Sequence, residues 1–326
     1  MTNTEFLILS SVDSLSVIKK IELYSFSILG KHFSTLQSAA DTIRFGGHTT
    51  VRENLLKGLI GSKTSFEFSS EAKRGISNIG LLAGQNLLRR ISIDSNFYDS
   101  NVVVGPNVFT SPKVFRKELM SQSIKRIITP SPWVLNFFVK QLPELEAKFC
   151  IWPSGVDFDY WAPQSDKRVS KEKVLIYSKK AHHSMEEDLI LLLKSKKIDF
   201  EKISYGNYSA AQYRAKLNEV NAVIYLGNSE SQGLALLEAW AMNVPTFVYY
   251  SNKEIAIRTE SELCRLNPDE YSPAPYLDGN KGSFWTSIPK IDSLLTNFGN
   301  YAPRDSSLEF SLPVTTLSYK ELFNEF

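Results

Sequence analysis

One strand–loop–helix–strand pattern in the second half of the chain restricts its fold most. The apolar, β-branched run Asn221–Leu226 precedes a loop that contains Gly233, and a run of helical composition follows at residues 234–242. Pro245 ends this helix, and residues 246–250, TFVYY, begin another strand. Such a βαβ unit requires a parallel sheet. Its loop lies at the carboxyl edge of that sheet, where open α/β sheets bind ligands.

Two carboxylates lie on either side of the predicted helix start. Glu230 precedes Gly233 in the loop, and Glu238 follows on the helix, eight residues after Glu230. A helix N-terminus offers free N–H groups to an anion, whereas a carboxylate accepts hydrogen bonds from hydroxyl groups. Both properties together suit a ligand that is part phosphate and part sugar. The structural alternative is that Glu230 stabilises the helix dipole and Glu238 lies on a solvated helix face.

Composition excludes several classes of protein. The 326 residues, 43% hydrophobic and 22% charged, are typical of a globular protein with room for two domains. The formal net charge of +2 comes without a dominant basic run, so we expect no nucleic-acid partner. Cys150 and Cys264 are expected to be reduced, buried thiols, and no His/Cys spacing predicts a metal site.

The chain carries no sequence signal for export or for membrane insertion. Its first residues, MTNTEFLIL, lack a basic region, and their apolar run is too short for a signal peptide. No apolar stretch approaches the roughly 20 residues that a transmembrane helix needs. We therefore expect a soluble, cytoplasmic protein, with peripheral association at the inner membrane face as an option.

Alternating apolar and amphipathic segments indicate two α/β domains, because this rhythm is typical of parallel sheets covered on both faces. A segment rich in turn formers at 152–163 and a charged stretch at 164–173 place the boundary near residue 160, giving domains 1–160 and 161–326. We expect a long loop at 271–283, and a final helix at Thr315–Phe326 for which packing against the first domain is one option. In the first domain, strands are predicted at Ile21–Ile28, Ser65–Phe68, Ile76–Leu82, Asn101–Val104, Arg126–Thr129 and Lys148–Trp152, and helices at Thr50–Leu59, Gln85–Ile91, Val114–Met120 and Pro132–Lys140.

Three segments of the chain resemble the signature of retaining GT-B glycosyltransferases of the family 4 type (glycosyl transferases group 1). The segment from Glu230 to Pro245, ESQGLALLEAWAMNVP, is similar to the family's EGFG and LEAMAxGxP in the same register. Residues 152–161, WPSGVDFDYW, resemble its PNGVD segment, and residues 128–133, ITPSPW, resemble its strand-to-Ser turn. Ser231, Gln232 and Asn243 depart from the usual residues. The resemblance implies a GT-B fold: two Rossmann-like domains that face each other across a cleft, the first binding an acceptor and the second a nucleotide sugar.

The resemblance also implies roles for the residues of the donor side. Glu230 would bind hydroxyl groups of the donor sugar as a catalytic residue, and Glu238 would accept hydrogen bonds from the ribose. Tyr205 and Gly206 follow a predicted strand at the place where the family holds the base, although a solvated turn is nearly as well supported. The diphosphate would be held by the backbone around the helix start, at Ser231, Gln232, Gly233 and Leu234.

Cations are expected near the leaving diphosphate, whose growing negative charge must be stabilised. The family uses an Arg and a Lys just beyond the first strand of the second domain, and here that strand is followed by SKKAHH at 178–183. Lys179 and Lys180 occupy the place of the first cation, with Lys180 as a catalytic candidate. Ser184 stands where the second is expected, so that Lys180, His182 or His183 would have to replace it. An ordinary solvated loop is the alternative.

The acceptor side is predicted with fewer signals. Gly47 and His48 precede a predicted helix, and a Gly-rich loop lies there in similar enzymes; His48 is the catalytic candidate of this domain. Arg52 lies one turn into the helix and could face the cleft. Asn107 follows a strand and could bind a sugar. A capped helix start and a plain loop are the structural alternatives.

The resemblance implies a hexosyltransferase-like, retaining and metal-independent enzyme of polysaccharide biosynthesis, without a cofactor besides its nucleotide-sugar co-substrate. Its acceptor would be a glycan or a lipid-linked saccharide. The DFD motif at 157–159 is read as a turn and not as a manganese site. The alternative function is a GT-B protein that binds sugar nucleotides or glycans without turnover, which the missing second cation favours. A dinucleotide-dependent oxidoreductase is excluded, because no GxGxxG follows an early strand.

Overall fold

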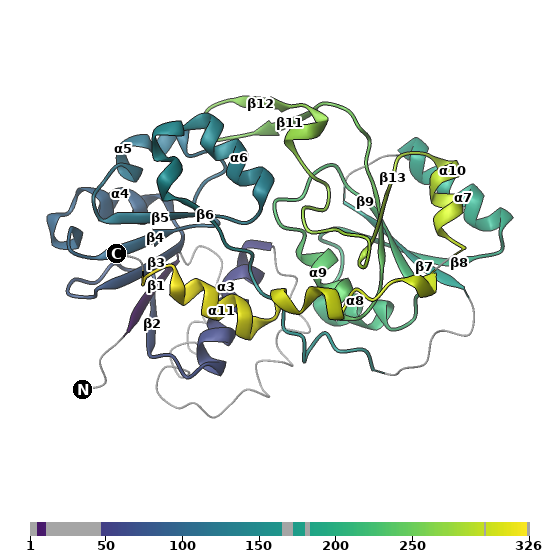
Figure 1. Cartoon of the computed structure of the whole chain (residues 1–326), viewed down its shortest axis with the longest axis horizontal. Helices are drawn as coiled ribbons and strands as arrows, with labels where there is room; N and C mark the ends of the chain where they lie inside the picture. The colour runs from purple at the N-terminus through teal and green to yellow at the C-terminus, as the bar shows by residue number, and fades with distance from the viewer. Residues whose placement is uncertain (1–4, 11–46, 165–171, 180–182, 297, 325–326) are drawn as a thin grey trace.

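Two parallel β-sheets, one from each half of the chain, lie beside each other in the computed structural model (Figure 1). The structure describes residues 5–10, 47–164, 172–179, 183–296 and 298–324. The strand predicted at 21–28 lies outside the described residues. The predicted strands between residues 65 and 152 correspond to strands of the first sheet, with bounds that differ by at most two residues.

The first sheet has the strand order β2-β1-β3-β4-β5-β6, with every neighbouring pair parallel. Its strands are β1 (Phe6–Ser10), β2 (Phe66–Ser69), β3 (Asn78–Ala83), β4 (Asn101–Val104), β5 (Ile124–Thr129) and β6 (Phe149–Ile151). The helices of this half are α3 (Gly47–Gly61), α4 (Gln85–Ile93), α5 (Arg116–Leu119) and α6 (Pro132–Gln141), with short 3-10 turns at Ser95–Phe97, Lys113–Phe115 and Pro143–Lys148.

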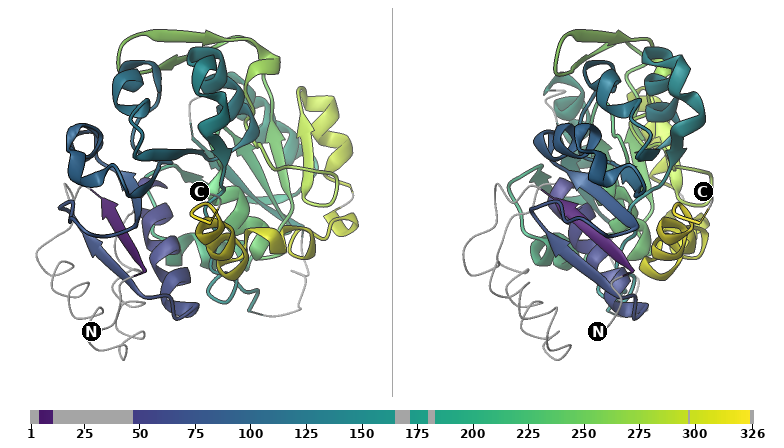
Figure 2. Two further views of the ribbon diagram at one scale, coloured as in Figure 1. Left: turned by 60° about the vertical axis from the view of Figure 1, so that its left-hand side comes forward. Right: turned by 90° about the vertical axis from the view of Figure 1, so that its left-hand side faces the viewer.

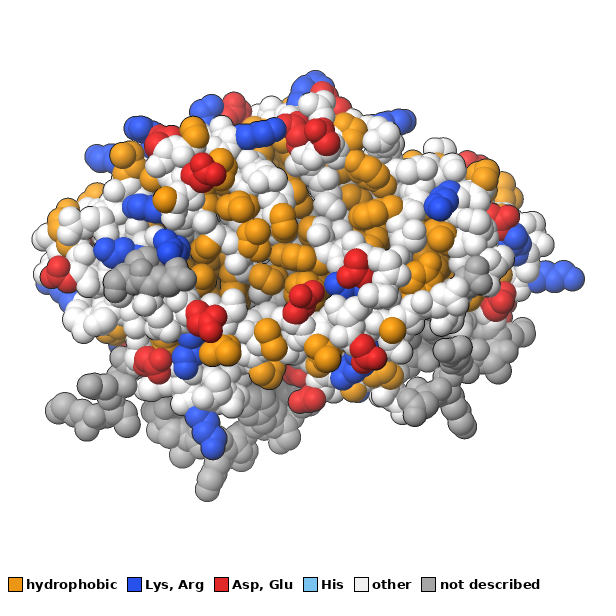
Figure 3. Space-filling model, viewed as in Figure 1, with side chains coloured by type: hydrophobic (Ala, Val, Ile, Leu, Met, Phe, Trp, Pro, Cys, Tyr) orange, Lys and Arg blue, Asp and Glu red, His pale blue; other side chains and the backbone are white. Residues whose placement is uncertain are grey.

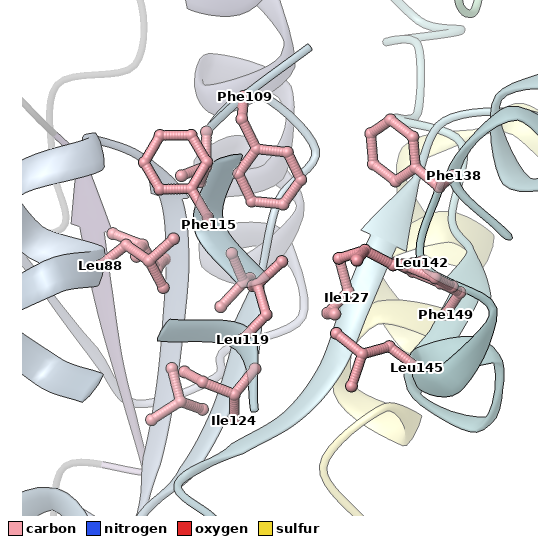
Figure 4. Close-up of a cluster of buried hydrophobic side chains, with 14 of the residues drawn as sticks. Leu88, Phe109, Phe115, Leu119, Ile124, Ile127, Phe138, Leu142, Leu145 and Phe149 are labelled. Atoms are coloured by element: carbon pink, nitrogen blue, oxygen red, sulfur yellow. The ribbon is translucent and has the colours of Figure 1, made fainter. Parts of the chain in front are cut away.

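Both faces of the first sheet are buried, which explains its continuous apolar strands. In β1, Leu7 and Leu9 contribute to one core while Phe6 and Ile8 contribute to the other, because successive side chains of a strand alternate between faces. The first core is covered by α4, α5 and α6 and is rich in aromatic rings; Phe109 stacks on Phe115 with ring centroids 5.4 Å apart (Figure 4). The second is covered by α3 and by the last helix of the chain.

The second sheet has the order β13-β10-β9-β7-β8, again with every neighbouring pair parallel. One face packs on α8 and α9 and the other on α7 and α10. The elements are β7 (Lys173–Ser178), α7 (His183–Ser195), β8 (Asp199–Ser204), α8 (Ala210–Leu217), β9 (Ala222–Leu226), α9 (Leu234–Ala241), β10 (Thr246–Tyr249), β13 (Gly282–Trp285) and α10 (Ile288–Leu294).

The two sheets share a strand order. Counted along the chain within each half, five strands of both sheets run 2-1-3-4-5. This order reverses direction between the first and third strand, and ligands bind in the crevice outside the carboxyl ends of the strands at such a switch point. The switch points lie between β1 and β3 in the first sheet and between β7 and β9 in the second.

Two segments of the second half cross over and pack on the first. The antiparallel hairpin β11 (Ile255–Arg258) and β12 (Leu263–Leu266) lies above the first-half helices in Figures 1 and 2, and Leu266 belongs to the first core. In its turn, the Glu260 carboxylate accepts hydrogen bonds from the backbone N–H groups of Thr110, at 2.7 Å, and Ser111, at 3.0 Å. The hairpin therefore braces one side of the contact between the halves.

The last helix braces the other side. α11 (Leu312–Glu321) contacts α3, and Tyr319 is fully buried in the first half (Figures 1 and 2). Glycines permit this approach: a Cβ atom at Gly58 would lie 1.8 Å from Thr316 Oγ1, and one at Gly155 would lie 2.1 Å from Thr315 Oγ1. Periodicity could not predict this docking, because the helix buries Thr315 and Thr316 while it exposes Val314 and Leu317.

Several elements were not predicted. β1 lies in the N-terminal run that was considered only as an export signal. No element was predicted for the hairpin β11–β12 or for α10, and β13 begins inside the loop that was expected at 271–283. The helix predicted at Val114–Met120 is a 3-10 turn followed by the short α5. Short apolar strands and turns have weak sequence periodicity. Their secondary structure therefore depends on pairing and packing with the rest of the sheet.

The surface shows charges of both signs distributed between the two halves, with hydrophobic side chains gathered over the middle of the face in Figure 3. Among the described residues, no helix is both long and apolar enough to cross a membrane.

Candidate functional site

The switch point of the second sheet brings together two charged residues that are 51 positions apart in the sequence. Lys179 directly follows β7, and its backbone N–H donates to the carbonyl of Leu226 at the end of β9, at 2.8 Å. Glu230 lies in the loop after β9. The Lys179 Nζ lies 2.7 Å from each oxygen of the Glu230 carboxylate. Glu230, which was expected to bind the sugar, and Lys179, which was expected to bind the diphosphate, thus form a salt bridge with each other in this structure.

The Glu230 side chain is only 8% exposed and has a second donor beneath it. The hydroxyl of Tyr225, on β9, donates a short hydrogen bond to Oε1 of Glu230. Tyr225 is buried, and its pKa is raised well above its ordinary value, first by desolvation and then by the charge of Glu230. It therefore stays protonated and remains a donor.

The loop that carries Glu230 is also held from outside its own sheet. The backbone carbonyl of Glu230 accepts a 2.8 Å hydrogen bond from the indole of Trp133, which lies at the start of α6 in the first half. The backbone N–H of Glu230 donates to the Ser272 carbonyl at 2.9 Å. The buried amide of Gln232 bonds the backbone of Ser154 in both directions, at 3.1 and 2.7 Å. The Gln232 side chain is therefore used for structure, which leaves its backbone for the predicted ligand.

The start of α9 faces the start of α3 from the other half. Gly233 has a left-handed conformation with φ of +83°, which glycine adopts without strain. A Cβ atom at Gly47, the first residue of α3, would lie 3.9 Å from Leu234 Cδ1. The first N–H groups of each helix have no intrahelical acceptor, so two positive helix ends lie close together. An anion between them would be stabilised from both halves.

Glu238 has a different environment from Glu230. It is half-buried on α9, and within the described part of the chain no group donates a hydrogen bond to its carboxylate. Desolvation raises its pKa to about 8. The pKa of Tyr208 is raised above its ordinary value, first by burial and then by the charge of Glu238. The Tyr208 side chain therefore lies within electrostatic reach of Glu238. An unpaired, partly desolvated carboxyl group is a candidate binding group.

Tyrosines form the floor of this region. Tyr177 and Tyr225 are register partners on β7 and β9, and their rings stack with centroids 4.8 Å apart. The hydroxyl groups of Tyr177 and Tyr208 are 2.6 Å apart, and the Tyr213 hydroxyl donates to the carbonyl of Ala235 in α9 at 2.9 Å. The cluster ties the two strands to the first turn of α9.

The remaining donor-side residues lie at the edge of this cluster. Tyr205 follows β8 and is 49% exposed, with the Lys179 Nζ 4.9 Å from its ring centroid. Gly206 follows it with φ of +79°, and Ser231 is exposed beside Glu230. Lys179 thus connects Tyr205 to Glu230. Lys180, His182 and the side chain of His183 lie outside the described residues.

The structure only partly assembles the predicted acceptor side. His48 is exposed beside Gly47, and partial desolvation of its ring lowers its pKa. Arg52 is buried, and its guanidinium bonds Glu53 at 3.1 Å and lies 5.8 Å from the Phe68 ring centroid. These contacts place the guanidinium beside Phe68 of β2, and a role for Arg52 toward an acceptor stays a prediction.

Asn107 and the DFD segment lie in loops. Asn107, after β4 at the carboxyl edge of the first sheet, donates its backbone N–H to Leu82 at 3.2 Å. Asp157 accepts from the Tyr160 N–H at 3.0 Å and pairs with Lys57 at 3.4 Å, which is the behaviour of a turn residue. Among the described residues, no group of three or more His, Cys, Asp or Glu side chains could hold a metal ion.

Two residues of the site were missed in the sequence. Tyr225 was read only as part of a buried strand, although tyrosine in an otherwise aliphatic strand five residues before Glu230 was a signal. Trp133 comes from the other half, and no spacing rule connects it to residue 230. Both became visible through their hydrogen bonds to Glu230.

Comparison with known proteins gives structural matches only. No protein-family model matches the chain, and no curated protein matches its sequence. A glycosyltransferase from Rickettsia africae ESF-5 is 14% identical, with a TM-score of 0.58 over 98% of both chains. HepE from Anabaena, solved in complex with UDP and glucose, is 9% identical, with a TM-score of 0.56 over 98% of this chain and 99% of HepE.

TarM from S. aureus is a larger neighbour. Its complex with fondaparinux, alpha-GlcNAc-glycerol and UDP is 13% identical to this chain, with a TM-score of 0.50 over 76% of this chain. The chain spans about half the length of TarM, since the match covers 55% of it. At such identities the likeness shows the fold alone. The chain has the GT-B fold, with two Rossmann-like domains built on parallel sheets.

Proposed function

We propose that this protein is a glycosyltransferase that moves a sugar from a nucleotide-sugar donor to a hydroxyl group of a glycan or lipid-linked saccharide. One observation carries the proposal. At the switch point of the second sheet, Lys179 pairs with Glu230 in the loop that leads into the glycine-started helix α9, and that helix carries Glu238, whose carboxyl group accepts no hydrogen bond from the described residues.

Each part of this arrangement suits one part of a nucleotide sugar. The helix N-terminus at Gly233 and the Lys179 ammonium favour a diphosphate. Glu238, ionised, can accept hydrogen bonds from both ribose hydroxyls, and Glu230 can accept them from the sugar. Tyr205, exposed beside Lys179, offers a ring face to the base. A protein that bound only a phosphate or only a sugar would not need both carboxylates.

The structural neighbours favour a uridine nucleotide as the donor carrier. HepE was solved with UDP and glucose, and TarM with UDP and saccharide-type ligands. The tyrosine-lined edge of the second domain is compatible with such a base. The acceptor would enter from the first domain, where Gly47 approaches Leu234.

The proposed reaction is retaining and independent of a metal or other cofactor. The glycosidic bond to the diphosphate breaks, and Lys179 and the two helix ends stabilise the charge that develops on the leaving oxygen. That oxygen takes the proton of the acceptor hydroxyl on the same face of the sugar, so that no protein nucleophile is required. Acceptors with a lipid carrier would bring the protein to a membrane surface by peripheral association.

A donor panel tests the proposal. The protein is incubated with UDP-glucose, UDP-galactose, UDP-N-acetylglucosamine, GDP-mannose and ADP-glucose, with EDTA present, and released nucleoside diphosphate is measured. We expect slow hydrolysis of at least one donor, and loss of nucleotide binding in Glu238→Ala. Binding without turnover for every donor and acceptor would favour the non-enzymatic sugar-nucleotide-binding protein, and no binding of any nucleotide would overturn both functions.

A further inference from the structure

We propose that Tyr225 is a positioning residue that holds the Glu230 carboxylate against the donor sugar while Lys179 binds the diphosphate. The inference rests on the proposed function and extends it to a residue outside the resembling motif. The Tyr225 hydroxyl donates to Oε1 of Glu230, and Lys179 bonds the same carboxylate from the cleft side at 2.7 Å.

The position of Tyr225 makes it a rigid donor. Its ring is 2% exposed on the central strand β9 and stacks on Tyr177 of β7 at 4.8 Å between centroids. The strands on which both rings stand are in parallel register at these residues. A ring packed in this way loses little further freedom when its hydroxyl makes a hydrogen bond. The bond to Glu230 is therefore preorganised.

Lys179 and Tyr225, which both donate to the Glu230 carboxylate, differ in whether they can move when a ligand binds. Lys179 is 26% exposed, and its flexible ammonium can leave Glu230 for the more highly charged diphosphate. The Tyr225 hydroxyl cannot follow, because its ring is fixed in the sheet. After the lysine moves, Tyr225 is the side-chain donor that keeps the buried carboxylate in place.

Tyrosine also leaves Glu230 able to bind a sugar. A carboxylate has two oxygens and about four acceptor positions, and Tyr225 occupies one of them from below. The hydroxyl is neutral, so it does not cancel the negative charge that attracts sugar hydroxyls. A lysine or arginine at position 225 would orient the carboxylate but would neutralise it as well.

The backbone of Glu230 is fixed independently of this bond. Its carbonyl accepts from Trp133 and its N–H donates to Ser272. Loss of the Tyr225 hydroxyl is therefore expected to release the carboxylate alone, without moving the loop or the start of α9. This separation allows sugar binding and diphosphate binding to be measured as different quantities.

The experiment uses Tyr225→Phe in the full chain. Dissociation constants are measured by calorimetry for UDP and for the nucleotide sugar that the donor panel selects, together with the steady-state rate. We expect the UDP constant to stay within about twofold, while the nucleotide-sugar constant rises and the rate falls, each by about tenfold. Tyr225→Met serves in its place if the Phe variant does not fold.

Tyr177→Phe is the matched control. It removes an equally buried hydroxyl from the same pair of rings, one that bonds Tyr208 and not Glu230. We expect it to lower the melting temperature as Tyr225→Phe does, without changing the ratio of the two dissociation constants. Equal effects of both variants on that ratio would overturn the proposal and leave the glycosyltransferase function standing.

A double-mutant cycle identifies the route of the effect. If Tyr225 acts through Glu230, Tyr225→Phe should have almost no effect on sugar binding in a Glu230→Gln background. Additive effects would overturn the proposal. If the wild-type protein binds UDP but no nucleotide sugar, both this inference and the proposed function fail, which distinguishes that result from failure of the inference alone.

Discussion

The two switch points have the same strand order but different side chains. In the second sheet, the strand ends lead to Lys179 and Glu230, which are paired, and to the tyrosine floor beneath them. In the first sheet, β1 ends at the buried Ser10, and β3 ends at Ala83 before Gly84. The topology therefore supplies an equivalent switch point in each half. In the second half, the described residues beyond the strands suit an anion, whereas the residues that follow β1 lie outside the described part of the chain.

Under the proposed function, the second half binds the donor and the first half binds the acceptor. A diphosphate needs cations and free N–H groups, whereas an acceptor hydroxyl needs access and a few neutral contacts. The first half contributes mainly by holding the second: Trp133 bonds the Glu230 carbonyl, and Ser154 bonds Gln232. Four substitutions test this difference between the halves, and the largest effect is expected at Glu230.

Glu230→Gln should have the largest effect on activity. Glutamine keeps the shape of the side chain, but it loses the charge that pairs with Lys179 and accepts sugar hydroxyls. We expect the transfer rate to fall by about a hundredfold or more. Initial-rate measurements with saturating donor check this. Glu219→Gln, which removes an exposed carboxylate paired with Lys173 at 3.0 Å, is the control; equal rates in both variants would refute the sugar role.

Gly233→Ala should weaken both stability and diphosphate binding. Its φ of +83° is strained for alanine, and the new Cβ would lie 3.0 Å from Leu236 Cδ1. We expect the free energy of unfolding to fall by about 1–2 kcal/mol and UDP binding to weaken by about tenfold, because the helix start must shift. Urea denaturation and calorimetry measure these. Gly279→Ala, where a Cβ meets nothing within 4 Å, should change neither.

Glu238→Gln should change the pH dependence of stability. The pKa of Glu238 is about 8 in the folded protein against an ordinary value of 4.5, so the folded state holds a proton that the unfolded state releases between these values. The protonated Glu238 side chain makes its full contribution to the free energy of unfolding below pH 4.5, and this contribution is lost as the pH rises to about 8. The variant should therefore gain stability over the wild type across this range, on the order of 2 kcal/mol after allowance for partial exposure.

The same substitution separates binding from folding. An ionised carboxylate accepts hydrogen bonds from both ribose hydroxyls more strongly than a neutral carboxyl or amide, so wild-type affinity for UDP should rise with pH up to about 8, whereas the variant should bind more weakly without that pH dependence. Denaturation curves and calorimetry from pH 5 to 9 measure both effects. A wild-type stability profile parallel to that of the variant would show that Glu238 is ionised in the folded state.

Trp133→Phe should have the smallest effect, and it tests whether the first half positions the second. Loss of one hydrogen bond to the Glu230 carbonyl is expected to lower the transfer rate by about fivefold, with UDP binding unchanged. Trp152→Phe removes a similar indole bond, 2.8 Å to the Thr315 carbonyl, away from Glu230. It should reduce stability only. Equal rates for both variants would limit the role of Trp133 to packing.

Much of the fold followed from local patterns. The βαβ unit from Asn221 to Tyr250 was predictable because the signals for its strand, glycine turn, helix and helix end follow one another along the chain. The structure confirms it as β9, α9 and β10. Lys179 and Glu230 were both singled out, since each follows a recognisable strand. The hairpin β11–β12 was not, because its burial depends on a core that the other half provides.

The two α/β halves and the residues at the carboxyl edge of the second sheet could be read from order and spacing along the chain, and the resemblance added the GT-B class. The pairing of Lys179 with Glu230, and the hydrogen bonds from Tyr225 and Trp133 to Glu230, follow from the folded arrangement. Those contacts join residues up to about a hundred positions apart. Their geometry depends on strand order and on the docking of the halves, which no local pattern records.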